Sequence, residues 1–209
     1  SAHSAGPDTL YFVSPSGRLK LWAAANLFGG QSLPRPAPSA LPLGPVVWLA
    51  LSPNWANDSA MMALVENDTC PGVGNALFIL QDTAIGWQPA VLGTPGACEA
   101  ITAAAFSPTY GRDALLFAAA AEPTTVLRSV DGGRSWVAAE TPFPAGVIDQ
   151  LVVSPAYAAD QTLFARLDDG ALYRSRDGGQ TWRAMSQPLD LLAALDAPGA
   201  ALTLFGARG

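Results

Sequence analysis

Short apolar segments, each of strand length, recur along this sequence and alternate with turns rich in proline, glycine and aspartate. In the clearest unit, apolar or alternating segments cover residues 149–154, 161–167, 171–175 and 181–185. Segments this short, bounded by turn residues, are typical of β-strands. The pattern therefore predicts units of four antiparallel strands, which we call strands A to D in chain order.

A first motif marks the turn between strands A and B. It reads Ser-Pro, then an aromatic residue two positions later, then Asp three positions after that. The motif covers residues 52–58, 107–113 and 154–160. A period of roughly 40–50 residues suits a propeller blade of four short strands. We expect the aromatic residue to pack inward and the Asp to cap the turn, the alternative being a ring of carboxylates that binds cations.

A second motif falls between strands C and D and keeps the same period. It consists of Ser129, Asp131, Gly133, Ser135 and Trp136 in one unit and of Ser175, Asp177, Gly179, Thr181 and Trp182 in the next. An earlier copy keeps only Asp82 and Trp87. In such a hairpin turn, Asp accepts backbone hydrogen bonds, Gly supplies a positive φ and the hydroxyl closes the loop. The Trp is expected to pack back on the sheet.

The two motifs in phase resemble the Asp-box repeats, also called bacterial neuraminidase repeats. Those repeats occur in sialidases, in sortilin-type receptors and in the propeller that assists photosystem II assembly. The resemblance covers residues 46–190 well and the ends loosely. It implies an all-β fold, a β-propeller of four-stranded antiparallel blades numbering about four to five. In that family the Asp box is a structural turn on the propeller rim and does not by itself imply catalysis.

The repeats predict a single propeller domain over residues 1–209. Its units are expected at approximately 46–100, 101–148 and 149–190, with a last blade made from 8–30 and 191–209. Building one blade from both termini removes exposed strand edges. The alternatives are a ring with an extra edge strand or partial blade, and an open arc completed by another chain.

Composition narrows the choice of partners. Only 13% of the residues are charged, the net charge is −6, and one lysine stands against ten arginines, so there is no basic stripe for nucleic acid. No apolar run approaches the roughly 18–20 residues that span a bilayer. A chain this poor in charge is expected to bury surface against a protein partner or a copy of itself, the alternative being a core that many strands reach.

Candidate chemistry is sparse, so we predict no catalytic residues, no metal site and no cofactor. The only histidine, His3, lies in the opening segment, which excludes histidine as a general base within the fold. A sialidase needs three converging arginines, whereas five of the ten arginines here lie in or beside the second motif, on the outer part of the blades. These arginines are Arg128, Arg134, Arg174, Arg176 and Arg183.

Two cysteines and a non-repeat insertion suggest where binding occurs. Cys70 and Cys98 lie in loop-like sequence and are expected to form a disulfide, the alternative being two buried thiols. The candidate binding loop carries Asn67, Asp68, Thr69 and Asn75. A chain starting at Ser1 is typical of one whose signal segment has been removed, although a shortened chain looks the same. We therefore expect an extracytoplasmic, secreted, periplasmic or cell-surface bacterial protein.

Three functions remain open from the sequence. The first is a non-catalytic interaction or assembly module. The second is a structural subunit of a larger envelope or filament assembly, whose incomplete propeller is completed by another chain. The third is a glycan-binding relative of the sialidases. The sequence favours the first.

Overall fold

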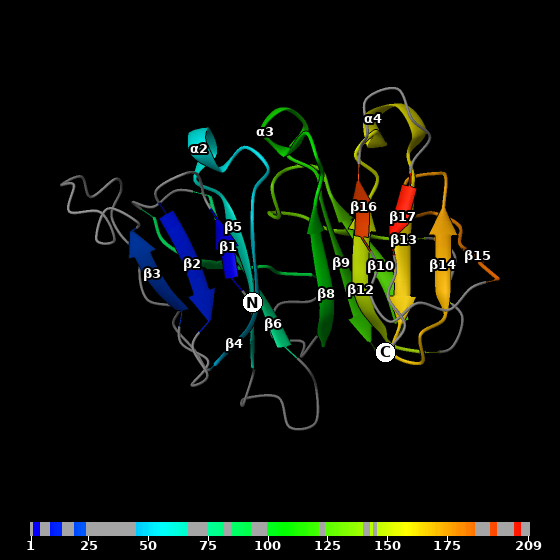
Figure 1. Cartoon of the computed structure of the whole chain (residues 1–209). Helices are drawn as coiled ribbons and strands as arrows, with labels where there is room; N and C mark the ends of the chain where they lie inside the picture. The colour runs from blue at the N-terminus through cyan, green and yellow to red at the C-terminus, as the bar shows by residue number, and fades with distance from the viewer. Residues whose placement is uncertain are drawn as a thin grey trace. The chain divides into compact units, whose positions relative to one another are not determined.

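The computed structural model describes most of the central part of the chain and short strands near its ends. The described residues are 2–4, 9–13, 19–23, 45–66, 75–81, 85–92, 100–121, 124–139, 143, 146–186, 193–195 and 203–205. Their regular structure is β-strand apart from one-turn helices (Figure 1). The chain divides into two compact units, Ser1–Ala90 and Val91–Gly209.

Unit 1 contains a three-stranded and a four-stranded antiparallel group, each paired in chain order. The first group consists of β1 (Ala2–Ser4), β2 (Thr9–Val13) and β3 (Leu19–Ala23). The second consists of β4 (Val46–Leu51), β5 (Met61–Glu66), β6 (Asn75–Leu80) and β7 (Gln88–Pro89). The one-turn helix α2 (Trp55–Asp58) connects β4 to β5.

Unit 2 contains two four-stranded antiparallel groups and a strand pair. One group consists of β8 (Ile101–Phe106), β9 (Leu116–Ala121), β10 (Thr124–Ser129) and β11 (Val137–Ala138). The other consists of β12 (Ile148–Val153), β13 (Leu163–Leu167), β14 (Leu172–Ser175) and β15 (Arg183–Ala184). The helices α3 (Tyr110–Asp113) and α4 (Tyr157–Asp160) lie at the same end of this unit (Figure 1). Strands β16 (Ala193–Leu195) and β17 (Thr203–Phe205) pair with each other.

The strands follow the predicted A-to-D pattern in all three four-stranded groups. The B strands are the most buried: β5 and β9 each bury their first five residues. A strand that is covered on both faces reads as a continuous apolar run, and Leu116–Ala121 has that character. The D strands are shorter than predicted, since β15 spans two exposed residues at the edge of its group.

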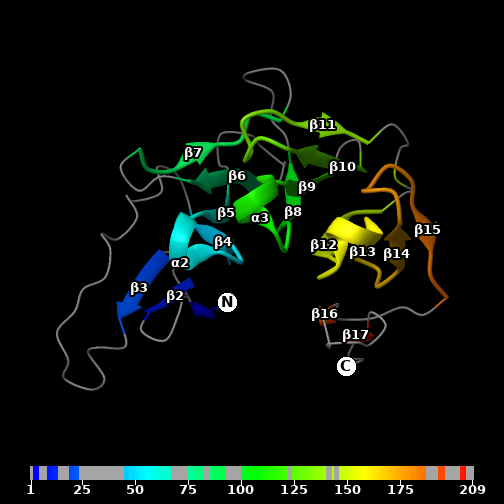
Figure 2. The same ribbon diagram turned by 90° about the horizontal axis from the view of Figure 1, so that it is seen from above.

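One hydrophobic core joins the two four-stranded groups of unit 2. Its fully buried members come from both groups and include Phe117 on β9 and Leu163 on β13. Tyr157 bridges them, because its ring meets Phe117 edge to face with centroids 5.4 Å apart. The view from above shows β8 to β11 and β12 to β15 as two successive groups (Figure 2). Unit 1 has its own core, built around Leu49, Met61 and Leu80.

The Ser-Pro motif forms the same hydrogen-bonded turn in each four-stranded group. In the β8–β9 turn, the Ser107 hydroxyl donates to Asp113 Oδ2 (2.7 Å). Asp113 Oδ1 accepts from the backbone N–H of Leu115 (3.0 Å). The aspartate therefore caps the turn, as predicted. The sequence did not predict the one-turn helix within it, nor the left-handed conformation of Ala114 (φ 50°) that ends the helix.

Candidate functional site

The glycine-rich hairpin between β10 and β11 is organised by one carboxylate. Asp131 Oδ1 accepts from the backbone N–H groups of Arg134 (3.0 Å) and Ser135 (2.9 Å). Its Oδ2 accepts from the Ser135 hydroxyl (2.6 Å). Gly133 has a φ of 93° and donates its N–H to the hydroxyl of the buried Ser129 (2.7 Å). These bonds fix the turn, and the backbone N–H of Gly132 ties it to the Ala114 carbonyl at the end of α3 (2.9 Å).

The hairpin between β14 and β15 repeats this arrangement. Asp177 accepts from the Thr181 backbone N–H (2.9 Å), the Thr181 hydroxyl and the Ser175 hydroxyl (2.7 Å). Trp182 Nε1 donates to the Gly179 carbonyl (3.0 Å), as Trp136 Nε1 does to Gly133 (3.1 Å). In each turn the indole thus bonds back onto the hairpin that carries it.

We predict that Ser135→Ala raises the pKa of Asp131. The hydrogen bonds from Ser135 are the largest cause of the lowering of that pKa from 3.8 to about 2. Because the folded pKa is depressed, the stabilisation by this carboxylate is present above pH 3.8 and is lost as the pH falls through about 2. A carboxyl NMR titration measures the pKa directly. Ser135→Thr keeps the hydroxyl and is the control; an unchanged pKa in Ser135→Ala would contradict the assignment.

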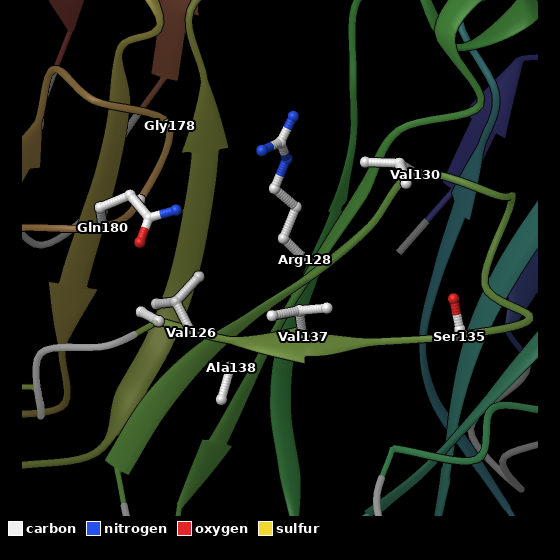
Figure 3. A pocket seen from close by; sticks show the side chains of 10 residues that line it. Val126, Arg128, Val130, Ser135, Val137, Ala138, Gly178 and Gln180 are labelled. Carbon is white, nitrogen blue, oxygen red and sulfur yellow. The ribbon is translucent and has the colours of Figure 1, made fainter.

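A cavity of about 170 Å³ lies in unit 2 between the two hairpins (Figure 3). One wall is a face of the β10–β11 hairpin, and the opposite wall is the turn that precedes β15. The lining residues are Val126, Arg128, Val130, Ser135, Val137, Ala138, Ala139, Gly178, Gly179 and Gln180. Arg128 lies opposite Val137 in the strand register, so these two side chains share a face.

The mouth of the cavity is apolar and exposed. Val130 is 60% exposed and Val137 is 72% exposed, and both line the cavity. Figure 3 shows the Arg128 side chain rising from β10 toward the space that these residues border, with Gln180 extending toward it from the facing turn. The cavity thus combines aliphatic walls with a single cation.

Two buried polar atoms near this cavity have no hydrogen-bond partner among the described residues. They are Arg128 Nε and the Tyr157 hydroxyl. Burial raises the pKa of Tyr157, and the positive charge of Arg128 opposes that rise, so the two groups are within electrostatic range. The hydroxyl lies directly behind Gly178, because a Cβ on that glycine would come within 2.9 Å of the oxygen.

The described residues contain one other charged contact of note, away from the cavity. Asp149 lies at a register shift between β12 and β13 and forms an ion pair with Arg166. Burial raises the pKa of Asp149, and Arg166 opposes the rise.

Among the described residues, no three histidine, cysteine or acidic side chains are grouped so that they could hold a metal ion. No helix in the described part of the chain is long and apolar enough to cross a membrane.

The sequence-predicted site residues fall into two sets. The two complete glycine-rich motifs form the hairpin turns described above, and Trp87 of the incomplete copy is buried at 6% exposure. Asn75 begins β6 and pairs with Glu66. The remaining predicted residues lie outside the described part of the chain: Asn67, Asp68, Thr69, Cys70, Asp82 and Cys98.

Sequence reasoning placed Arg128 on the outer part of the blades without a role. In the structure it lines a cavity beside the β10–β11 hairpin, a role that the sequence reasoning missed. The available signal was the alternation Val126, Arg128, Val130, which puts one charge between two apolar side chains on the same strand face.

Comparisons with known proteins identify the fold. No protein-family model matches the chain, and no curated protein matches it. The structure is similar to the GH74 xyloglucanase from Xanthomonas campestris, with a TM-score of 0.61 and 17% identity over 90% of this chain and 29% of that one. It is also similar to YCF48 from Cyanidioschyzon merolae, with a TM-score of 0.55 and 16% identity over 89% of this chain and 56% of that one.

A third similar structure is the GH74 enzyme of Niastella koreensis, with a TM-score of 0.57 and 19% identity over 92% of this chain and 30% of that one. This chain therefore spans little more than half, or less, of the length of these proteins. The neighbours are β-propellers, and the chain has their all-β fold of four-stranded antiparallel blades. The predicted fold class is thus confirmed.

Proposed function

We propose that this chain is a non-catalytic, extracytoplasmic module of protein interaction or assembly, built on an Asp-box propeller. The cavity between the two hairpins is the observation that carries the proposal. It lies between turns that are fixed by hydrogen bonds within each hairpin and to the A–B turn of the same group, and its mouth exposes Val130 and Val137. Rigid scaffolds that present an exposed apolar patch beside one charge are typical of binding surfaces.

The chemistry of the cavity supports binding rather than turnover. Its only ionisable lining side chain is Arg128, and none of its lining residues is a carboxylic acid, a histidine or a cysteine. Glycoside hydrolysis needs a pair of carboxyl groups that flank the bond to be cleaved. Asp149, whose pKa is raised by burial, is already paired with Arg166 and does not line the cavity.

We predict that the double variant Val130→Thr/Val137→Thr loses peptide binding while keeping its fold. Peptides are selected from a displayed random library on the full chain, and their affinities are measured by calorimetry. Threonine keeps the β-branched shape but adds a hydroxyl, so the apolar contact weakens. For two exposed valines we expect about a tenfold loss of affinity.

Val47→Thr is the matched control, since Val47 is an exposed valine (45%) that does not line the cavity. The proposal fails if no peptide is enriched, or if enriched peptides bind the double variant as well as the wild type. Hydrolysis of xyloglucan by the purified chain, lost in Asp149→Asn, would also overturn it.

A further inference from the structure

Arg128 lines the cavity as its one cation, and its Nε has no hydrogen-bond partner in the part of the chain that the structure describes. It lies on β10 between Val126 and Val130 in sequence and opposite Val137 across the hairpin. Its Nε is buried, and no described residue accepts a hydrogen bond from it. A buried donor without an acceptor costs about 1–3 kcal/mol, and more when the group is charged. An acceptor supplied by a ligand would remove that cost.

The acidic side chains of the surrounding turns do not supply this acceptor. Asp131 and Asp177 are held by the hydroxyl and backbone N–H groups of their own hairpins. The negative charges of Asp113 and Asp160 contribute to the raised pKa of the neighbouring Tyr157. These two carboxylates accept hydrogen bonds from the serines of their own A–B turns. Each of these carboxylates thus accepts its hydrogen bonds within its own turn, and none of them pairs with the Arg128 guanidinium.

Arg128 also differs from its counterpart in the next group. Arg174 occupies the equivalent position on β14, directly before the buried Ser175. It does not line the cavity, and it lies opposite Arg183, whereas Arg128 lies opposite a valine. The repeat therefore presents the same residue type in two environments, and among the described residues a facing glycine-rich turn forms a second wall beside Arg128.

The size of the cavity limits what enters it. A cavity of about 150 Å³ holds a molecule such as benzene, whereas pockets for drug-sized ligands are about 300–1,000 Å³. The present cavity, at about 170 Å³, suits one medium side chain. The exposed valines at its mouth provide apolar contact for the residues on either side of that chain.

We propose that the cavity around Arg128 binds the carboxylate of an acidic side chain, glutamate or aspartate, presented by a partner polypeptide. This inference rests on the proposed function and names the chemistry of the partner. Arginine binds a carboxylate through two parallel N–H···O bonds, which satisfies the guanidinium. Val130 and Val137 contact the apolar neighbours of the acidic residue.

A phosphate group fits this site less well than a carboxylate. Phosphoryl groups carry about two negative charges and three strong acceptor oxygens, and are typically met by several cations. The cavity lining contains one cation, Arg128, and the backbone N–H groups of its glycines already donate hydrogen bonds within the protein. Gly178 donates to the Gln161 carbonyl, and Gly179 donates to the Ser175 hydroxyl.

The test uses two pentapeptides with capped termini that differ only in whether the central side chain ends in a carboxylate or an amide. Each has a central residue flanked by valine on both sides; that residue is glutamate in the probe and glutamine in the control. Calorimetry measures their binding to the full chain and to Arg128→Gln, with Arg174→Gln as the matched variant. We expect the glutamate peptide to bind the wild type about tenfold or more tightly than the glutamine peptide. Arg128→Gln should remove this preference, and Arg174→Gln should keep it.

A second measurement keeps the proposal testable if Arg128→Gln does not fold. The glutamate peptide should shift the backbone amide NMR signals of Val130 and Gln180 in the wild-type chain, and the glutamine peptide should not. Equal binding of the two peptides overturns the proposal, as does tighter binding of a phosphoserine peptide or of a peptide whose only carboxylate is its C-terminus. Library peptides that depend on Val137 but contain no acidic residue would overturn this inference and leave the proposed function intact.

Discussion

Phe117→Ala is expected to lower the free energy of unfolding of unit 2 by about 3–5 kcal/mol, the usual cost of truncating a buried aromatic side chain. Phe117 is fully buried on β9 and packs edge to face against Tyr157 of the following group. The loss therefore removes contacts within one four-stranded group and between two. Few rearrangements can refill the space, because Leu163 and Ala165 on the facing strand are themselves fully buried.

Hydrogen exchange shows whether the two groups of unit 2 unfold together. If their shared core makes them one cooperative unit, Phe117→Ala should reduce protection in β9 and in β13 by the same free energy. Denaturant titration gives the total loss. Val137→Ala is the control, because Val137 is largely exposed and its truncation should change stability by less than about 0.5 kcal/mol. A loss of protection confined to β9 would contradict a shared cooperative core.

The sequence predicted the strands best where two signals coincide. Strand B of each unit follows the capped Ser-Pro turn and is rich in apolar residues. Both its start and its identity are therefore marked, most clearly in β9 (Leu116–Ala121), which is a continuous apolar run. Strand D carries a weaker signal, because it lies at an edge and needs no apolar side chains. The prediction of 181–185 accordingly exceeds the observed β15 (Arg183–Ala184).

The candidate site was not predictable from periodicity. Arg128 and Gly178 lie in different repeats, and the cavity between them depends on how the two four-stranded groups pack. Local sequence treats Arg128 and Arg174 alike, since each directly precedes the serine of a glycine-rich turn. They differ in the residue across the hairpin, Val137 for Arg128 and Arg183 for Arg174, and in the facing turn that completes the cavity around Arg128. The left-handed Ala114 was missed for a related reason: a non-glycine residue at positive φ is imposed by the hydrogen bonds of its turn.

Gly178→Ala is expected to destabilise unit 2 by about 2–3 kcal/mol, through two separable causes. The first is backbone strain, because Gly178 has a φ of 73°, which disfavours any residue with a Cβ. The second is a steric clash, since the new Cβ would lie 2.9 Å from the Tyr157 hydroxyl. Tyr157 is buried and its ring is packed on Phe117, so the hydroxyl has little freedom to move away.

A double-mutant cycle with Tyr157→Phe separates the two causes. Phenylalanine keeps the ring packing and removes a buried hydroxyl for which the described residues supply no hydrogen-bond partner, so Tyr157→Phe alone should be neutral or slightly stabilising. In that background Gly178→Ala should cost only the backbone strain of about 1–2 kcal/mol. The difference, a coupling of about 1 kcal/mol, is measured by denaturant unfolding of the four proteins. Strict additivity would mean that the hydroxyl does not press on this turn. The back wall of the cavity would then be set by the φ of Gly178 alone.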